Sequence, residues 1–242
     1  HIEGLSRDCQ LYLPAKKHKA LNRALDHPGA TLSKSAQVMR KNGNWYAVVY
    51  VKCPLPEITE AKGWYGNDVG VRASVTRSDG HQGPDLRPIL KAQKEKTAER
   101  QRQGMPADFG RQTPQKQVLA HEARMLVLVA LATGRGIALE DPKRLPRWHG
   151  WAARYFAKRV VLLASMVGVQ VTLIAPPYTS LTCSHCGSVK TFRYRSMFRC
   201  HQCGHTVNAD FNASCNIRSR ACDLRSSSNG TQRFLPEVGA NT

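Results

Sequence analysis

Residues 64–80 read WYGNDVGVRASVTRSDG. The apolar and β-branched residues from Trp64 to Thr76 predict one long strand, and Ser78-Asp79-Gly80 predicts the turn that ends it. Asp68 lies inside this strand, where a carboxylate is costly unless something pairs with it. We therefore expect a domain that begins at this strand and carries an acid with a specific role.

Alternating helices and strands follow this first strand along the chain. Residues 115–133 place apolar side chains at helical spacing and stop before Gly134, as a helix with a C-terminal glycine does. A buried strand is expected at 136–140, a second helix at 151–167 and another strand at 169–175. The order strand, helix, strand, helix, strand predicts an α/β layer.

The segments around this layer differ in character. Residues 36–53 predict a β-hairpin, because two strand-like runs flank the turn Lys41-Asn42-Gly43-Asn44. Residues 54–62 contain two prolines and predict a linker. Residues 91–117 predict a solvated helix or a mobile loop, and residues 224–242, rich in Ser, Asn and Gly, predict a disordered tail.

The chain is strongly basic. Its 242 residues contain 36 Lys and Arg against 17 Asp and Glu, which gives a formal net charge of +19. Such a balance attracts polyanions, so nucleic acid is the expected partner. Charge alone leaves open a basic protein that merely stays soluble or touches an anionic membrane. No run of about 18 apolar residues occurs, so no membrane-spanning helix is expected.

Four of the eight cysteines form two C-x-x-C knuckles separated by thirteen residues. Four thiolates at this spacing give zinc a closed tetrahedral shell with no open position for substrate. We therefore predict a structural zinc ribbon in a reducing compartment, with a pair of redox-active C-x-x-C motifs as the alternative. The predicted zinc ligands are Cys183, Cys186, Cys200 and Cys203.

The residues near these cysteines have their own expected roles. His185, His201 and His205 are predicted to be surface residues, because the cysteines already fill the shell. Between the knuckles, basic residues interleave with aromatic ones, which suits a phosphate backbone and stacked bases. A small ribbon also needs aromatic side chains to cover its core. These interleaved residues are Lys190, Arg193, Tyr194, Arg195, Phe198 and Arg199.

Three acidic residues stand out in a chain this basic. Asp68 lies in the first strand, Glu140 ends the buried strand 136–140, and Asp210 stands just past the second knuckle, where a helix is expected to begin. Acids at strand ends and a helix start predict a site for divalent cations. Taken singly, each has another explanation: a turn for Asp68, a surface salt bridge for Glu140, and a helix N-cap for Asp210.

In order and spacing, these motifs resemble the nuclease domain of TnpB proteins and type V CRISPR effectors. DVGVRASVTRSDG at 68–80 is similar to their first RuvC motif, IALED at 137–141 to their second, and VNADFNASCNI at 207–217 to their third. PPYTSLTCSHCG at 176–187 and FRCHQCGHTVNADFNAS at 198–214 are similar to the ribbon that interrupts that domain.

The resemblance covers roughly residues 45–220 and implies both a fold and a chemistry. The implied fold is α/β: an RNase H-like (RuvC) mixed sheet with flanking helices, a small inserted zinc ribbon and a preceding β-rich wedge-domain fragment. Asp68, Glu140 and Asp210 would hold catalytic Mg²⁺, two ions in all, beside one structural Zn²⁺. The implied partners are guide RNA and target DNA, in a prokaryotic cytoplasm.

The resemblance also divides the chain. The expected parts are the end of a wedge-like β domain at 1–60, the first part of the nuclease at 61–177, the zinc ribbon at 178–206, the last part of the nuclease at 207–222 and the tail at 223–242. Because the family's recognition and wedge regions come earlier and are mostly absent, we expect the C-terminal portion of a larger effector.

Asn67 departs from the family pattern, because the residue directly before the first motif's aspartate is usually apolar in the family. The departure keeps open a second function, a guide RNA-dependent DNA-binding effector that silences its target without cleaving it. A zinc-ribbon binding module unrelated to nucleases is a third, but it leaves the motifs around Asp68 and Glu140 unexplained. The leading expectation is an RNA-guided, Mg²⁺-dependent DNA endonuclease.

Overall fold

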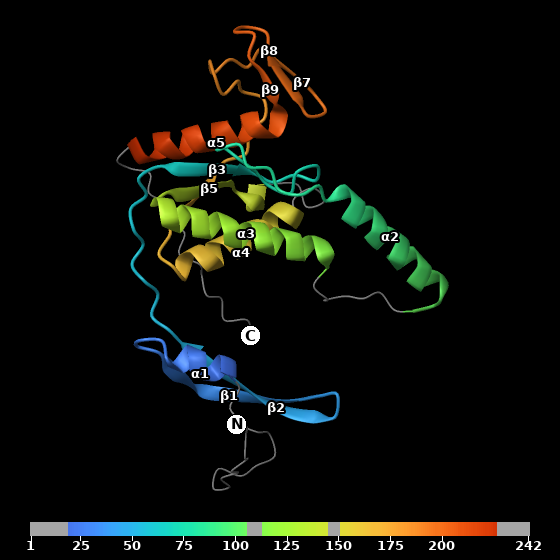
Figure 1. Ribbon diagram of the computed structural model, residues 1–242, viewed down its shortest axis with the longest axis vertical. Helices are drawn as coiled ribbons and strands as arrows, with labels where there is room; N and C mark the ends of the chain where they lie inside the picture. Colours follow the sequence, from blue (N-terminus) through green and yellow to red (C-terminus); the bar gives the residue numbers. More distant parts are fainter. Residues whose placement is uncertain (1–18, 106–112, 145–150, 227–242) are drawn as a thin grey trace. The chain divides into compact units, whose positions relative to one another are not determined.

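The computed structural model describes residues 19–105, 113–144 and 151–226, and the chain divides into two compact units, His1–Leu55 and Pro56–Thr242. The first unit contains a short helix and a two-stranded antiparallel sheet (Figure 1). These elements are α1 (Lys19–Leu25), β1 (Thr31–Lys41) and β2 (Asn44–Lys52).

The hairpin predicted around the Asn-Gly turn is confirmed. Lys41 pairs with Asn44, so the loop consists of two residues only. Asn42 and Gly43 both have positive φ, 52° and 80°. A two-residue loop whose twist matches the strands needs this conformation at both central positions, and Asn-Gly is the pair that adopts it most readily.

The second unit is built on a four-stranded mixed sheet in the order β4-β3-β5-β6. Strands β3, β5 and β6 run parallel, and β4 pairs antiparallel with β3 at the edge. The predicted strand at 136–140 is confirmed to the residue, and the one at 169–175 is confirmed in its central part. The strands are β3 (Trp64–Asp68), β4 (Thr76–Arg77), β5 (Gly136–Glu140) and β6 (Val171–Ile174).

The single long strand predicted from Trp64 to Thr76 is wrong. Strand β3 ends at Asp68, and the chain turns back so that Asp68 pairs with Thr76 of β4. The apolar residues between them do not form a strand, because Val69 and Val75 pack into the core from a loop. Their hydrophobicity reflects this burial.

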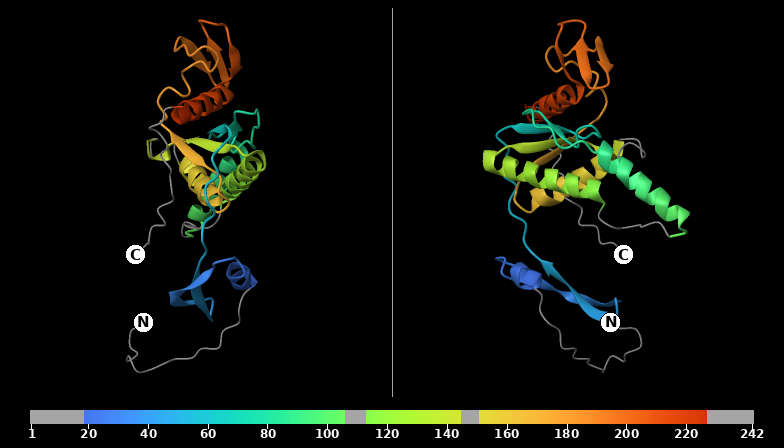
Figure 2. Two further views of the ribbon diagram at one scale, coloured as in Figure 1. Left: turned by 90° about the vertical axis from the view of Figure 1, so that its left-hand side faces the viewer. Right: turned by 45° about the vertical axis from the view of Figure 1, so that its right-hand side comes forward.

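Helices cover both faces of the sheet. Figure 2 shows α3 and α4 together on one face and α5 on the other. Both helices predicted from spacing are confirmed, and α3 ends at Gly134 with a left-handed φ of 64°. Helix α2 buries none of its residues, which agrees with a solvated helix. The bounds are α2 (Arg87–Arg102), α3 (Pro114–Thr133), α4 (Trp151–Ser165) and α5 (Ala209–Ser226), with a 3₁₀ turn at Pro142–Arg144.

Alternation along the central strands separates two hydrophobic cores. Ile137 and Leu139 of β5 belong to the larger core with α3 and α4, whereas Ala138 belongs to the smaller core with Ile217 of α5. Successive side chains of a strand point to opposite faces, so each helical layer receives alternate residues. Among the described helices, none combines the length and the apolarity that a membrane crossing requires.

The cysteine-rich segment forms a separate three-stranded sheet in the order β7-β8-β9, beside the first turn of α5 (Figure 1). Helix α5 begins at Ala209, directly after β9, and continues to Ser226, into the predicted tail; residues 227–242 lie outside the described residues. The strands are β7 (Thr191–Tyr194), β8 (Met197–Cys200) and β9 (Thr206–Asn208).

A glycine of β3 allows α5 to lie on the sheet. A Cβ atom added at Gly66 would stand 2.5 Å from the backbone nitrogen of Arg218 and closer still to the backbone oxygen of Ser214. These are backbone atoms of α5, and they have no flexible side chain that could move aside. The helix therefore approaches the strand at a distance that only glycine permits.

We predict that Gly66→Ala lowers the free energy of unfolding by about 3 kcal/mol or more, because α5 must move off the sheet. Thermal and denaturant unfolding would measure the loss. Gly63→Ala is the matched control, since a Cβ atom there meets nothing within 4 Å. Equal stability of the two variants would show that α5 does not press on β3.

Candidate metal centres

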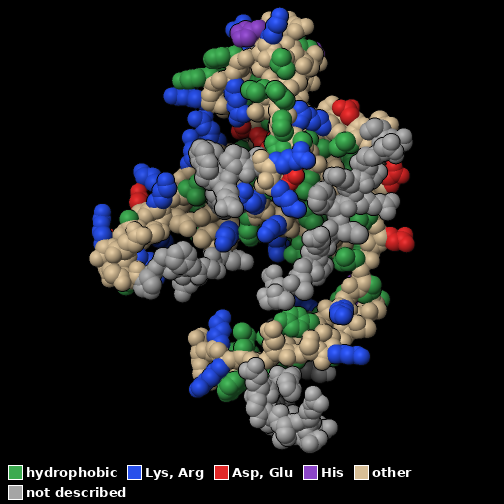
Figure 3. Space-filling view, turned by 180° about the vertical axis from the view of Figure 1, so that it is seen from behind, with side chains coloured by type: hydrophobic (Ala, Val, Ile, Leu, Met, Phe, Trp, Pro, Cys, Tyr) green, Lys and Arg blue, Asp and Glu red, His purple; other side chains and the backbone are tan. Residues whose placement is uncertain are grey.

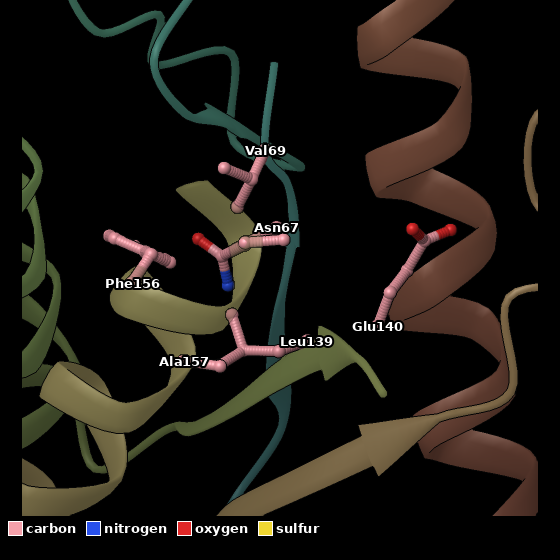
Figure 4. A pocket seen from close by; sticks show the side chains of 7 residues that line it. Asn67, Val69, Leu139, Glu140, Phe156 and Ala157 are labelled. Atoms are coloured by element: carbon pink, nitrogen blue, oxygen red, sulfur yellow. The ribbon is translucent and has the colours of Figure 1, made fainter. Parts of the chain in front are cut away.

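Two of the predicted acids lie side by side on one face of the sheet. Asn67 of β3 pairs with Leu139 of β5 in parallel register, so Asp68 and Glu140 are the next residues on adjacent strands. Both follow residues whose side chains face α4, and alternation therefore turns the acids toward α5. Figure 4 shows the Glu140 carboxylate pointing to that helix.

The third acid, Asp210, belongs to the first turn of α5. It does not cap the helix, because the side-chain oxygen of Asn208 accepts the backbone N–H groups of Asp210 (2.9 Å) and Phe211 (3.1 Å). Asn208 is therefore the N-cap, and the carboxylate of Asp210 remains available for other contacts. Its position at the positive end of the helix dipole favours its negative charge.

The structure brings the three acids into electrostatic contact. Burial raises the pKa of Asp68 to about 7, and the charges of Glu140 and Asp210 add to the effect. Asp68 keeps some solvent exposure, yet enough protein surrounds it for desolvation to be the largest cause. Acids that repel one another in this way create the field that a divalent cation would neutralise.

An arginine from the cysteine-rich sheet already contacts this group. The Arg193 guanidinium of β7 lies 2.9 Å from an Asp210 carboxylate oxygen, and its charge lowers the pKa of Asp68. The sequence pattern predicts that Arg193 contacts nucleic acid, but it does not indicate that Arg193 lies beside the acids. Only the fold places the tip of the β7 strand beside the start of α5.

Glu140 has neighbours that the motifs did not single out. Burial raises its pKa, while a hydrogen bond from the Thr179 hydroxyl and the charge of Arg220 lower it. The Thr179 hydroxyl is also 2.8 Å from the Pro176 carbonyl, and its single hydrogen serves only one of the two acceptors. Thr179 belongs to the Tyr-Thr-Ser segment before the ribbon, so this segment helps to orient Glu140.

The structure gives little support to the simpler explanations of the three acids as a turn residue, a surface salt bridge and a helix N-cap. Asp68 ends a strand, Asp210 is not the helix cap, and Glu140 takes part in no ion pair found among the described residues. The three acids form a looser group than the cysteines, since among the described residues only the cysteines gather tightly enough to enclose one ion.

The four cysteines form a compact group. Their sulfur atoms all lie within 4.8 Å of one another, with Cys183–Cys203 at 3.8 Å and Cys186–Cys200 at 3.6 Å. Sulfur ligands about 2.3 Å from a zinc ion stand about 3.8 Å apart in a tetrahedron, so the spacing fits zinc. The backbone N–H of Cys203 contributes most to lowering the pKa of Cys200, to about 6, which favours the thiolate that a metal requires.

The two knuckles have the same backbone form. Gly187 donates its N–H to the Cys183 carbonyl and Gly204 donates to the Cys200 carbonyl, each with a left-handed φ above 70°. Glycine adopts this conformation without strain, which explains its place after the second cysteine of each knuckle. None of the three nearby histidines belongs to the sulfur cluster.

Two buried asparagines of α5 attach the cysteine-rich segment to the helix. Asn212 accepts the Ser184 N–H at 2.9 Å and donates to the Thr182 carbonyl at 2.8 Å. Asn216 donates to the carbonyls of Thr179 and Thr182. Both lie in the VNADFNASCNI motif, but nothing in their spacing indicated this role.

Basic side chains are numerous in the second half of the chain. Figure 3 shows Lys and Arg crowding one face of the molecule around a few acidic groups. From 141 to 220 the sequence contains twelve Lys and Arg and two Asp, one of which is Asp210. A polyanion is attracted to such a surface without its sequence being read.

Comparisons with known proteins point to one family. A family model described as the Cas12f1-like TNB domain matches residues 154–217. The CRISPR-associated endodeoxyribonuclease Cas12f1 of Sulfoacidibacillus thermotolerans is 32% identical over 103 residues, which are 39% of this chain and 24% of that protein. Over these segments the chain is similar to members of the type V CRISPR effector family.

A second relative is similar to part of the chain. Cas12f2 of Micrarchaeota archaeon (strain CG1_02_47_40), also named a CRISPR-associated endodeoxyribonuclease, is 37% identical over 76 residues, covering 28% of this chain and 14% of that protein. The chain thus spans about a quarter or less of the curated relatives of this family that it matches.

Solved structures of the family share the fold. A Cas12f1 complex with sgRNA and target DNA superposes with a TM-score of 0.50 at 17% identity, over 77% of this chain and 56% of that one. A CRISPR-Cas12f ternary complex superposes with a TM-score of 0.50 at 19% sequence identity. The match covers 76% of this chain and 44% of that one. The expected α/β class, a mixed sheet with flanking helices, is confirmed.

Without divalent cations, the chain is expected to lose stability as the pH rises from about 4 to about 7. The pKa of Asp68 is about 7 in the folded chain against its ordinary 3.8, so the folded state holds this proton over a pH range where the unfolded state has lost it. Asp68→Asn, whose amide does not ionise, should therefore match the unmodified chain below about pH 4 and exceed its melting temperature above about pH 7. A constant difference across this range would contradict the prediction.

The purified chain is expected to contain one zinc ion, measured by elemental analysis, and Cys200→Ser is expected to lose it along with thermal stability. Cys222→Ser is the control, because Cys222 is exposed and lies outside the sulfur cluster. Absence of zinc from the unmodified chain, or a disulfide between Cys183 and Cys200, would overturn the zinc ribbon.

Proposed function

We propose that this chain is the C-terminal portion of an RNA-guided DNA endonuclease that cuts DNA by two-metal hydrolysis. The observation that carries the proposal is the convergence of Asp68, Glu140 and Asp210, from two strand ends and a helix start, at one edge of the sheet. The printed names of the relatives, endodeoxyribonucleases, support the same reaction.

In this proposal Asp68, Glu140 and Asp210 would together hold two Mg²⁺. Carboxylate oxygens are the ligands that Mg²⁺ prefers. When bound, the two ions would activate a water and stabilise the leaving oxygen of a phosphodiester, giving a product with a 5′ phosphate. The Thr179 hydroxyl holds the Glu140 carboxylate in place for this role.

Arg193 has a part in the proposal because of its contact with Asp210. Its guanidinium neutralises the acids while no cation is bound, and a cation at Asp210 would replace that contact. A guanidinium released beside the site is well placed to bind the anionic oxygens of the DNA backbone. The ribbon would in this way contribute directly to the site.

The rest of the molecule fits the same proposal. One structural Zn²⁺ is held by the four cysteines, and the first unit is the end of a wedge-like β domain that contacts guide RNA. The solved relatives, a Cas12f1–sgRNA–target DNA complex among them, support guide RNA and target DNA as partners. Base pairing to the guide would select the sequence, and the basic surface would hold the backbone.

The alternative function is a guide RNA-dependent DNA-binding effector that silences its target without cleaving it. The observation that favours it is Asn67, a buried polar residue directly before Asp68 where the family is usually apolar. The two functions share partners and differ only in turnover, so a cleavage assay separates them.

We expect Asp68→Ala, in the full-length effector with its guide, to reduce cleavage at least about 10²-fold while target binding stays nearly unchanged. The carboxylates act on the scissile phosphate, whereas affinity comes from base pairing and basic residues. Asp79→Ala, which removes a carboxylate from the turn after β4, is the control and should cut normally.

Two other outcomes of this assay are informative. Equal loss of binding and cleavage in Asp68→Ala would assign a structural role to Asp68. Tight target binding by the unmodified effector without cleavage in Mg²⁺ or Mn²⁺ would favour the silencing function. Asn67→Ile would then test whether the buried amide suppresses turnover.

A further inference from the structure

A single arginine of α5 holds the start of the segment that connects β6 to the first cysteine knuckle, residues 175–182. Arg220 Nη1 lies 2.9 Å from the carbonyl oxygen of Ala175 and 2.8 Å from that of Pro177. This nitrogen carries two hydrogens, so it donates to both carbonyls at once. Hydrogen bonds from a charged donor are about twice as strong as neutral ones, so Arg220 fixes this part of the segment firmly.

Asn216, one helical turn before Arg220, holds the end of the same segment. Its Nδ2 donates to the carbonyls of Thr179 at 2.8 Å and Thr182 at 2.7 Å. Residues four apart on a helix lie on the same face, so both side chains reach the segment from one side of α5. Asn216 is buried, and an unpaired buried amide would destabilise the fold, which favours keeping these bonds.

The backbone of this segment is strained at Tyr178. Its φ is 66°, in the left-handed region that a bulky residue rarely adopts. The Tyr178 side chain is 63% exposed, so its own packing does not explain the conformation. Such strain persists only where the surroundings over-determine the backbone, and it concentrates at functional sites. The next residue is Thr179, which is 2% exposed.

The buried hydroxyl of Thr179 connects the segment to the acids, because it donates to Glu140 Oε1. The nearby Pro176 carbonyl already accepts the Thr179 backbone N–H at 3.3 Å, so it does not require the hydroxyl hydrogen. Within the described part of the chain, no group donates a hydrogen bond to the other oxygen, Glu140 Oε2. Figure 4 shows this carboxylate directed toward α5, the helix that carries Asp210.

We propose that Arg220 is a positioning residue for Glu140: by fixing residues 175–182 on α5, it keeps the Thr179 hydroxyl on one carboxylate oxygen and leaves the other oxygen for a cation. The inference rests on the proposed function, which gives Glu140 a cation to bind. A carboxylate already held at one oxygen loses less freedom on binding, so cation affinity should depend on Arg220. Helix α5 would then supply one ligand itself, Asp210, and orient a second.

The test measures Mn²⁺ binding by the chain, from the loss of the free-ion signal in electron paramagnetic resonance, and so does not depend on cleavage. Thr179→Val replaces the hydroxyl with a methyl group of similar size. Arg220→Met removes the guanidinium and keeps a long side chain. Because the charge of Arg220 acts on Glu140, its loss alone would strengthen cation binding, and a weakening therefore reports lost positioning.

We expect Thr179→Val to weaken Mn²⁺ binding about tenfold and Arg220→Met to weaken it about threefold. Thr179→Ser, which keeps the hydroxyl, should bind Mn²⁺ as the unmodified chain does. If Arg220 acts through Thr179, adding Arg220→Met to Thr179→Val should cause no further weakening.

Two variants of α5 control for charge and for stability. Arg218→Met removes an exposed charge from the same helix, and Arg218 makes no hydrogen bond to residues 175–182 in the described part of the chain. Ile217→Val weakens the small core that Ile217 shares with Trp64. Neither variant should weaken Mn²⁺ binding, while melting curves show how much stability each has lost.

The outcomes separate this inference from the proposed function. Arg220→Met that binds Mn²⁺ as tightly as the unmodified chain, or that weakens binding further beside Thr179→Val, would reject Arg220 as a positioning residue and leave the proposed nuclease intact. An equal weakening in Ile217→Val, at the same loss of melting temperature, would also reject it. Failure of the unmodified chain to bind Mn²⁺ would contradict the proposed function as well.

Discussion

The close approach of α5 to β3 at Gly66 is the constraint on which the rest of the second unit depends. Because the helix lies against the strand backbone, Asp210 in its first turn comes close to Asp68 at the end of that strand. The small core of Trp64, Ala138 and Ile217 holds the contact along its length. One residue without a side chain thus permits acids far apart in sequence to lie near one another.

The same helix links the acids to the cysteine-rich sheet. Asn208 caps α5, and Asn212 and Asn216 bind the segment that leads into the first knuckle, so the sheet is anchored where the acids are. Arg193 then reaches Asp210 from β7. Repulsion among three partly buried carboxylates opposes this arrangement, and it is offset by a proton on Asp68, by the guanidinium or by bound cations. A ribbon that holds zinc would fix the position of that guanidinium.

Much of this fold was predictable because local patterns and tertiary packing agree. The turn at Asn42-Gly43, the helix that ends at Gly134 and the strand at 136–140 follow from turn chemistry, capping and burial alone. The region from Trp64 to Thr76 was mispredicted because a loop that packs into the core has the same apolar composition as a strand. The roles of Thr179, Arg193 and Asn212 were not predictable, since each depends on a partner at least 17 residues away in sequence that only the fold brings near.

The central claim, that Asp68, Glu140 and Asp210 together hold a pair of divalent cations, is tested most directly by titrating the chain with Mn²⁺ under electron paramagnetic resonance. Two Mn²⁺ are expected to bind per chain, with the magnetic coupling of ions about 4 Å apart. This coupled signal should disappear in Asp68→Asn, which removes one of the three carboxylates. A single uncoupled ion, or a coupled pair that persists in Asp68→Asn, would contradict the account.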